Sequence, residues 1–253
     1  MLQLPTPVLG EVSAITITTP DLERSFSFYT KLGFSEVMRM EFPFPWIQIT
    51  DGALLIMLRK DDTPYIAQTY YVKDIDKSVK LVEDAGLSFA EKPRPADMIR
   101  KYLLRSPDGT NISLVHIPDG YTRPKGPTML TMPPQDYTNP EKYVNKSCGM
   151  FGEFAIPVED LDRSISFWEK LGFRALSKTP GQHPWAILSD GLAIVGLHQT
   201  KEFDKPTITF FASDMKEKIE SLKQKEVEVY KEINAANMVL STPEQQRINL
   251  FKL

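Results

Sequence analysis

The stretch "PDLERSFSFYTKLGF" (residues 20–34) returns later in the chain as "EDLDRSISFWEKLGF" (residues 159–173). The two stretches are offset by 159 − 20 = 139 residues, and Trp46 and Trp185 keep the same offset without a gap. A register preserved over this distance indicates an internal duplication. The chain therefore contains two copies of one structural unit, and the repeated stretch has the pattern of its helix.

The residues around the first copy of the helix predict short strands. Residues 13–20, "SAITITTP", alternate as in a half-buried strand, Asp21 is a typical helix N-cap, and Gly33 is a typical helix end. The Asp51-Gly52 pair is typical of a turn between two strands. Further strands are expected over residues 34–40, 46–50 and 53–58. The pattern then starts again, with strands expected over residues 67–72, 87–93, 101–106 and 111–117 and a helix over residues 74–86.

The second copy predicts the same order of elements, which gives four βαβββ units in two pairs. A single unit exposes one face of a curved sheet and cannot bury it alone, so the units must pair. The segment between the copies is rich in Pro and turn formers, and we expect it to be a linker laid over the surface. The expected divisions are a first domain over residues 1–119, a linker over residues 120–149 and a second domain over residues 150–253.

Composition and charge exclude several classes of protein. Hydrophobic residues make up 42% and charged residues 25% of the 253 residues, as in an ordinary globular protein. The net charge of −3 has no blocks of like sign, so we expect no nucleic-acid partner. No segment has the pattern of a signal peptide or membrane span, which predicts a cytoplasmic protein. The lone Cys148 cannot form an internal disulfide and is expected to be structurally neutral.

The repeated helix, the turn-linked strands and the closing "SPDGTNISL" (residues 106–114) resemble the vicinal oxygen chelate superfamily. This superfamily includes glyoxalases, extradiol dioxygenases and bleomycin-type antibiotic-binding proteins. The resemblance covers both copies and implies an α+β fold in which paired units form cupped, mainly antiparallel mixed sheets. Each cup would surround a central cavity, so two copies imply two cavities.

The resemblance also implies four positions in each cavity from which family enzymes hold a divalent metal through His, Gln or Glu. In the first copy only Gln68 among these positions could coordinate, and a single neutral ligand does not hold a metal, so we expect that cavity to be metal-free. The matching residues in the first copy are Ala14, Met57, Gln68 and Ser113. In the second copy they are Glu153, Gly196, Thr207 or Ile208, and Asn249.

The second cavity has one residue of a metal-ligand type, Glu153. His198 lies two residues beyond Gly196, on the same strand face, and could approach Glu153 because the first and last strands of a unit are neighbours. We therefore expect no cofactor, with a divalent metal at a partial site of Glu153, His198 and Asn249 as the alternative. A carboxylate on an inward strand face needs a partner or water, so Glu153 could be a general base, a ligand, or a member of a structural ion pair.

Strand alternation predicts which side chains face each cavity. Ala14 and Thr16 should point inward in the first copy, and Gln68, Tyr70, Ser113 and Val115 should share the same cavity face. Trp46 and Trp185 either wall a planar ligand or are core aromatics retained by the duplication. Arg59, at the place that matches His198, either binds an anionic ligand or is simply solvated. The candidate ligand-binding residues are Trp46, Arg59, Gln68, Tyr70, Ser113, Trp185 and Asn249.

Two function classes remain open, binding and catalysis. The first hypothesis is a monomeric or homodimeric protein that binds a small, partly aromatic organic molecule without a metal. The alternative is a glyoxalase-like lyase or isomerase, of the lactoylglutathione lyase type, in which Glu153 removes a proton beside a carbonyl and a metal or His198 stabilises the enediolate. A third alternative, an extradiol-type dioxygenase, needs two His and a carboxylate around iron, which neither set of positions supplies.

Overall fold

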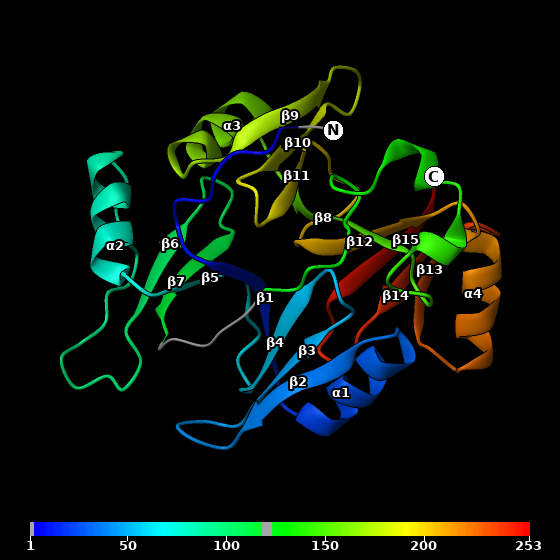
Figure 1. Ribbon diagram of the computed structural model, residues 1–253, viewed down its shortest axis with the longest axis horizontal. Coiled ribbons are helices and arrows are strands. Elements are labelled where there is room, and N and C mark those ends of the chain that lie inside the picture. The colour runs from blue at the N-terminus through cyan, green and yellow to red at the C-terminus, as the bar shows by residue number, and fades with distance from the viewer. Residues whose placement is uncertain (1–2, 118–122) are drawn as a thin grey trace.

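The computed structural model describes residues 3–117 and 123–253, which form two mixed β-sheets with helices packed on one face of each (Figure 1). The four helices are α1 (Leu22–Lys31), α2 (Ile75–Asp84), α3 (Leu161–Lys170) and α4 (Met215–Gln224). The first sheet contains β1 (Val12–Thr19), β2 (Ser35–Met40), β3 (Trp46–Thr50), β4 (Leu55–Lys60), β5 (Ile66–Val72), β6 (Lys101–Arg105) and β7 (Asn111–His116). The second contains β8 (Met150–Pro157), β9 (Arg174–Thr179), β10 (Trp185–Ser189), β11 (Ile194–His198), β12 (Thr207–Ala212), β13 (Val229–Asn234), β14 (Asn237–Ser241) and β15 (Arg247–Lys252).

The repeated helices begin in the same way. The side chains of Asp21 and Asp160 each accept a hydrogen bond, 3.0 Å long, from the backbone N–H three residues later. This contact satisfies one of the donors that the first turn of a helix leaves free. Both helices stop before a glycine with positive φ, Gly33 at 91° and Gly172 at 86°. The duplicated sequence therefore has a duplicated local structure, as predicted.

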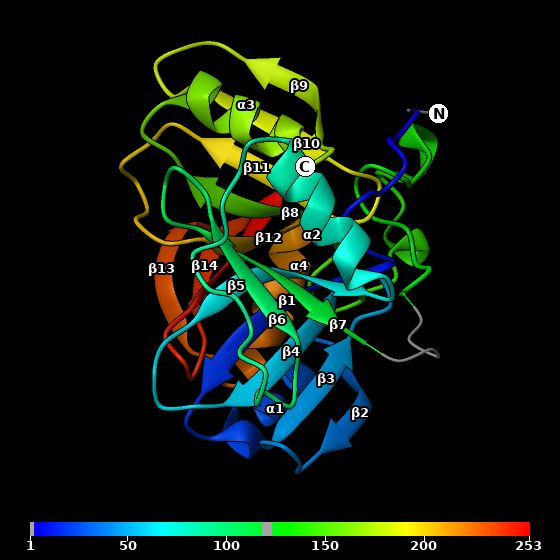
Figure 2. The ribbon, with the colours of Figure 1, turned by 90° about the vertical axis from the view of Figure 1, so that its left-hand side faces the viewer.

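The two units of each copy lie edge to edge in one sheet. The strand order of the first sheet is β2-β3-β4-β1-β5-β7-β6, and that of the second is β13-β14-β15-β12-β8-β11-β10-β9. In both sheets the two units join through their first strands, which run antiparallel as β1 with β5 and β8 with β12. The sequence left open how the units pair, and in this structure they pair within each copy. The two sheets lie next to each other, with β2–β4 and β9–β11 at opposite ends of the molecule (Figure 2).

One predicted strand is absent from the described residues. Residues 87–93 were expected to pair, but only Glu91 forms an isolated bridge, with Leu103. Pro93 and Pro95 lack the backbone N–H that a strand ladder requires, so the segment cannot extend along β6. The prediction of four complete βαβββ units is therefore wrong for the second unit, and the first sheet has seven strands where the second has eight.

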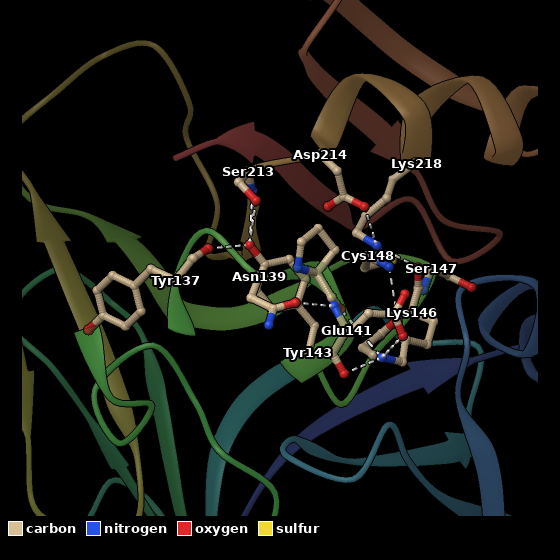
Figure 3. A network of polar contacts seen from close by, with 12 residues as sticks. Tyr137, Asn139, Glu141, Tyr143, Lys146, Ser147, Cys148, Ser213, Asp214 and Lys218 are labelled. Atoms are coloured by element: carbon tan, nitrogen blue, oxygen red, sulfur yellow. Dashed lines mark hydrogen bonds and ion pairs between the residues drawn. The ribbon is translucent and has the colours of Figure 1, made fainter. Parts of the chain in front are cut away.

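Part of the segment between the two copies is buried and contacts both of them. Tyr143 and Cys148 are completely or almost completely buried, and Asn145 donates a hydrogen bond of 3.1 Å to Asp51 in the first copy. Tyr143 also shares a hydrogen bond of 2.9 Å with Ser213 (Figure 3). Burial raises the pKa of the Cys148 thiol far above its ordinary value. Most described residues of the predicted linker are at least partly exposed, but its C-terminal end also makes buried contacts that the prediction did not include. The predicted boundary at residue 119 lies outside the described residues.

The two copies exchange contacts through equivalent turns. Asp108, in the turn before β7, accepts hydrogen bonds from the Ser164 hydroxyl on α3 and, at 3.1 Å, from the Glu159 backbone N–H. Glu244, in the turn before β15, accepts bonds of 2.8 Å from the hydroxyl of Ser25 and 2.7 Å from that of Tyr29, both on α1. A turn of each copy is therefore hydrogen-bonded to the first helix of the other copy, or to the residues just before it.

A further buried bond links the sheets, because the Tyr70 hydroxyl donates to Asp190 at 2.7 Å. Burial raises the pKa of Tyr70 well above its ordinary value, and the nearby Asp190 charge adds to the shift. Burial also raises the pKa of Asp190. Among the residues that the structure describes, no helix is both long and apolar enough to cross a membrane.

Candidate functional site

Each sheet has a cavity on the face away from its helices. The N-terminal cup, defined by the inward residues of β1, β4, β5 and β7, encloses about 800 Å³. The C-terminal cup, defined by the inward residues of β8, β11, β12 and β15, encloses about 380 Å³. Trp46 lines the first and Trp185 the second, at equivalent positions of the repeat. Both volumes lie within or near the range of small-molecule pockets, which is about 300–1,000 Å³.

Alternation predicts the face of β1 correctly but that of β5 wrongly. Directly opposed residues of an antiparallel pair share a face, and Ala14 lies opposite Thr69, not Gln68. Gln68 points away from the cup and donates hydrogen bonds of 3.1 Å to the Ser13 hydroxyl and 3.2 Å to the Ala14 carbonyl oxygen. Tyr70 also lies on that outer face, where it contacts the second copy through its bond to Asp190.

The reason for this error is visible in the burial of β5. Its residues from Ala67 to Val72 are all buried, so the strand has no alternation of polar and apolar side chains that could reveal its register. Thr69 and Tyr71 therefore take the cavity positions that were expected for Gln68 and Tyr70. Ser113 and Val115 line the N-terminal cup, as predicted.

The N-terminal cup has no metal-ligand set at the four family positions, which are occupied by Ala14, Met57, Thr69 and Ser113. The two hydroxyls are already engaged. Thr69 shares a hydrogen bond of 2.8 Å with Thr16, and Ser113 shares one of 2.7 Å with Tyr65. A methyl group, a thioether and two hydroxyls do not fit a divalent metal, which prefers carboxylate and imidazole ligands in such sites.

The wall of the N-terminal cup is aromatic and rich in Met. Trp46 is only 7% exposed and packs with Met57 and Tyr71 in a small apolar cluster of its own, so it is both a wall and a core residue. Met38 and Met40 extend the wall from β2 and are 41% and 46% exposed. Arg59 enters the same cavity from β4 and forms an ion pair of 2.9 Å with Asp61.

The C-terminal cup is built around Glu153, which is 5% exposed. Its Oε1 lies 2.9 Å from His198 Nε2, so the two residues are in contact as expected from their neighbouring strands. Its Oε2 is buried and has no hydrogen-bond partner among the described residues. Gly196 makes this arrangement possible, because a β-carbon at that position would overlap Glu153 Oε2. The Trp185 ring stacks near His198, with centroids 6.3 Å apart and planes 22° apart.

Asn249 lies in the same cup but directs its amide elsewhere. Its Nδ2 donates to the hydroxyls of Thr207 and Thr209, at 3.0 and 3.2 Å. The register shows that Thr209, opposite both Glu153 and Asn249, takes the position for which Thr207 or Ile208 was expected. Ile208 is 1% exposed and packs in the main core.

The donors in the C-terminal cup do not fit an iron site of two His and one carboxylate. The family positions hold one carboxylate, one glycine, one hydroxyl and one amide. Two imidazoles, those of His183 and His198, line the cup outside these positions, and His198 is hydrogen-bonded to the carboxylate. Within residues 3–117 and 123–253, no three His, Cys, Asp or Glu side chains are grouped closely enough to hold a metal. We derive no reaction step through a metal at this position.

Several residues that line the two cups were not predicted from the sequence. Lys101 and Tyr65 line the N-terminal cup, and Tyr230 and Arg247 line the C-terminal one. Lys101 could have been found, because it lies opposite Val115, a residue predicted to face inward. Tyr65 precedes β5 in a loop, and no periodic pattern indicates its direction.

Comparison with known proteins shows which other proteins share this architecture. The family model of the Glyoxalase/Bleomycin resistance protein/Dioxygenase superfamily matches residues 11–114 and 150–236. No curated protein matches the chain by sequence.

Three solved structures illustrate the similarity in fold. The 2,3-dioxygenase LapB from Pseudomonas sp. KL28 is 16% identical with a TM-score of 0.62, and the match covers 98% of this chain and 93% of that one. A catechol 2,3-dioxygenase is 13% identical with a TM-score of 0.58, covering 98% and 89%. Homoprotocatechuate 2,3-dioxygenase from Arthrobacter globiformis is 15% identical with a TM-score of 0.61, covering 100% and 82%. At these identities the similarity shows the fold alone.

Proposed function

The chain belongs to the Glyoxalase/Bleomycin resistance protein/Dioxygenase superfamily, and from this premise we propose that its N-terminal cup binds a small, partly aromatic organic molecule without a metal. The observation that carries the proposal is the combination of a cavity of about 800 Å³ with Ala14, Met57, Thr69 and Ser113 at the four family positions. The cup has space for a ligand, and its four family positions have no group that would anchor a metal.

The chemistry of the wall supports an apolar, planar ligand. Aromatic rings such as Trp46 and Phe44 offer flat contact surfaces, and Met38 and Met40 have flexible thioether side chains that adapt to different shapes. Burial of apolar ligand surface stabilises a complex by about 25 cal/mol per Å² before the costs of association. Binding would therefore come from burial of the ligand in the cup, and no covalent chemistry is needed.

The test is a fluorescence titration with the neutral aromatic probe N-phenyl-naphthylamine. We expect saturable binding that is unchanged by a chelator and weakened about tenfold by Trp46→Ala, since an aromatic wall residue makes a large contribution to such a contact. Trp185→Ala, at the equivalent position of the C-terminal cup, is the matched control and should leave the affinity within about twofold of wild type. Equal losses in the two variants, or no saturable binding, would contradict the proposal.

The C-terminal cup supports a second candidate, proton transfer of the glyoxalase type. Glu153 is buried, lies on the cavity face and is held by His198 at 2.9 Å, which is the geometry of an oriented general base. In such a reaction Glu153 would take the proton from the hydroxyl-bearing carbon beside a carbonyl and return it to the former carbonyl carbon, while the hydroxyl proton moves to the former carbonyl oxygen. The test is isomerisation of the methylglyoxal–glutathione hemithioacetal, with Glu153→Gln as the inactive variant. Equal activity of this variant and wild type would reject the candidate.

Extradiol-type ring cleavage is the alternative that the names of the structural neighbours raise. The two imidazoles that line the C-terminal cup, His183 and His198, lie outside the four family positions, and among the described residues no three His, Cys, Asp or Glu side chains are grouped closely enough to hold iron. An oxygen-uptake assay with catechol, after incubation of the protein with ferrous iron, tests this alternative directly. Uptake that depends on both iron and catechol would place ring cleavage above binding.

A further inference from the structure

We propose that the ligand of the N-terminal cup is an organic acid, whose anionic group is held between Arg59 of β4 and Lys101 of β6. This inference rests on the proposed binding function of the same cup and adds the chemical class of the ligand. It follows from two cations that face the cavity and are incompletely neutralised.

Lys101 is the first of these cations. It lies opposite Val115 in the β6–β7 register, on the cavity side of the sheet, and its ammonium is 5.4 Å from the centre of the Tyr65 ring. Among the described residues the ammonium has no hydrogen-bond or ion-pair partner. Burial, together with the charge of Arg59, lowers the pKa of Lys101. An anion in the cup would offset both effects.

Arg59 is the second cation. Its guanidinium carbon lies 5.4 Å from the centre of the Phe44 ring and 5.6 Å from that of the Tyr65 ring, so two aromatic side chains hold it in place. One nitrogen, Nη2, is paired with Asp61 at 2.9 Å, while Nε is buried and has no partner within residues 3–117 and 123–253. A guanidinium presents five donors, and here part of that set is free for another acceptor.

The charge balance of the cup favours an anion. Its described lining includes Arg59, Arg100 and Lys101 but no Asp or Glu. Arg100 already has an ion-pair partner, Asp76, at 2.5 Å. Asp61 pairs with Arg59, while the charges of Glu91 and Asp61 act on Lys101 without a direct contact, so among the described residues Lys101 has no ion pair of its own in a partly desolvated site. A desolvated cation that lacks a partner is costly, and a carboxylate that accepts hydrogen bonds from it removes that cost.

The arrangement also defines the shape of the ligand. Arg59 lies directly opposite Trp46 in the β3–β4 register, so the cationic end of the cavity adjoins its aromatic wall. Met38 and Met40 line the same cavity from β2. A ligand with a carboxylate at one end and an aromatic or branched apolar body at the other would contact both regions together.

The experiment compares two fluorescent probes that share one scaffold. Anilinonaphthalenesulfonate carries a sulfonate that stands in for the carboxylate, and N-phenyl-naphthylamine lacks it. In the double variant Arg59→Met/Lys101→Met we expect the anionic probe to bind about tenfold or more weakly, because charge-assisted hydrogen bonds are lost. The neutral probe should stay within about threefold of its wild-type affinity, since Met preserves the apolar stem.

Two further variants make the result specific. Arg59→Lys/Lys101→Arg keeps both charges and should bind the anionic probe within about threefold of wild type. Arg247→Met removes a cation from the C-terminal cup and should leave the affinity for both probes unchanged. Thermal melting of every variant confirms that it is folded at the temperature of the titration.

The outcomes separate this inference from the proposed function. If the neutral probe binds to the N-terminal cup but the double variant keeps its affinity for the anionic probe, the organic-acid inference is overturned and the binding function stands. Loss of the anionic probe in Arg247→Met also overturns it, because the anion would then lie in the C-terminal cup. If neither probe binds the wild-type protein, the binding function fails and the inference fails with it.

Discussion

The N-terminal and C-terminal cups have the same frame and different chemistry. Both have a Trp at the start of a middle strand, Trp46 and Trp185, and both have a Thr, Thr69 or Thr209, on the first strand of the second unit. Where the first cup has Arg59, the second has His198. The first is the larger, at about 800 Å³ against about 380 Å³. The helices and turns carry the fold, while a few inward strand positions determine what each cavity can bind.

The differences between the cups are coupled through space. Glu153 fits in the C-terminal cup because the neighbouring strand offers Gly196. In the N-terminal cup the corresponding pair is Ala14 and Met57, a small residue beside a large one. The C-terminal cup fills this volume with a carboxylate beside a glycine. The N-terminal cup fills the equivalent volume with a methyl group beside a thioether. Substituting one member of a pair should therefore lower the free energy of unfolding more than substituting both members together.

The largest expected effect comes from Gly196→Met, which copies one residue of the N-terminal cup into the other. Its β-carbon would overlap Glu153 Oε2, so we expect the free energy of unfolding to fall by about 3 kcal/mol in urea denaturation. Adding Glu153→Ala recreates the pair of the N-terminal cup and should restore stability to within about 1 kcal/mol of wild type. Equal stabilities of the single and double variants would show that the two positions are not coupled.

The next comparison removes the polar side chains at the matching positions of β4 and β11. His198→Leu leaves both oxygens of the buried Glu153 with no partner in the described part of the chain, and the free energy of unfolding should fall by about 2 kcal/mol. Arg59→Leu breaks a partly exposed ion pair with Asp61 and should cost only about 0.5 kcal/mol. Chemical denaturation of both variants measures the difference, and similar losses would contradict a special role for the C-terminal pair.

A smaller effect tests the bond that joins the sheets of the two cups. Because burial and then the charge of Asp190 raise the pKa of Tyr70, the folded chain keeps a phenol proton that the unfolded chain loses near pH 10. The contribution of Tyr70 to stability is therefore present below pH 10 and decreases by about 1 kcal/mol per pH unit above it. Tyr70→Phe should flatten this loss in urea midpoints measured between about pH 9 and 11.

Tyr29 provides the control for the alkaline measurement. Its pKa is also raised, by burial and then by the charge of Glu244, so the Tyr29→Phe variant should flatten the curve to a similar extent. The double variant should show the weakest dependence on pH. A Tyr70→Phe curve that falls as steeply as wild type would mean that this phenol is accessible to solvent in the folded chain.

The smallest effect concerns the walls of the cups. Met40 of the N-terminal cup corresponds to Thr179 in the second copy, at the offset of 179 − 40 = 139. Met40→Thr should weaken binding of N-phenyl-naphthylamine by about threefold, because a flexible apolar contact is lost. The reverse change, Thr179→Met, should leave the affinity unchanged. A larger loss from Thr179→Met than from Met40→Thr would place the probe in the other cup.

Much of the fold follows from the sequence because it depends on local patterns. The repeated stretch, its capping Asp residues and the terminating glycines predict the helices, and alternation in β1 and β8 predicts that Ala14 and Glu153 face inward. Alternation fails in β5, where every side chain from Ala67 onward is buried and both possible registers look alike. The absence of a strand near Glu91 could also have been predicted from the sequence, because the neighbouring prolines lack the backbone N–H that a strand ladder requires.

The candidate sites are harder to predict because they combine distant segments. The contact of Glu153 with His198 could be anticipated from neighbouring strands. The sequence does not indicate that Glu153 Oε2 has no partner among the residues that the structure describes. Lys101, Arg59 and Tyr65 meet only through the order of the sheet, which places β6 and β4 on opposite sides of β1 and β5. A charge balance within a cavity depends on which side chains line it, and that requires the three-dimensional structure.

The exchanged turns have a consequence for the history of the chain. Asp108 contacts Ser164 in the second copy, and Glu244 contacts Ser25 in the first, so the same contact occurs twice, once in each direction between the copies. A symmetric homodimer of a single ancestral copy would make this pair of contacts between two molecules. In such a dimer every substitution appears in both cavities. Joining the two copies in one polypeptide removes that constraint, because a mutation then alters one cavity and leaves the other unchanged.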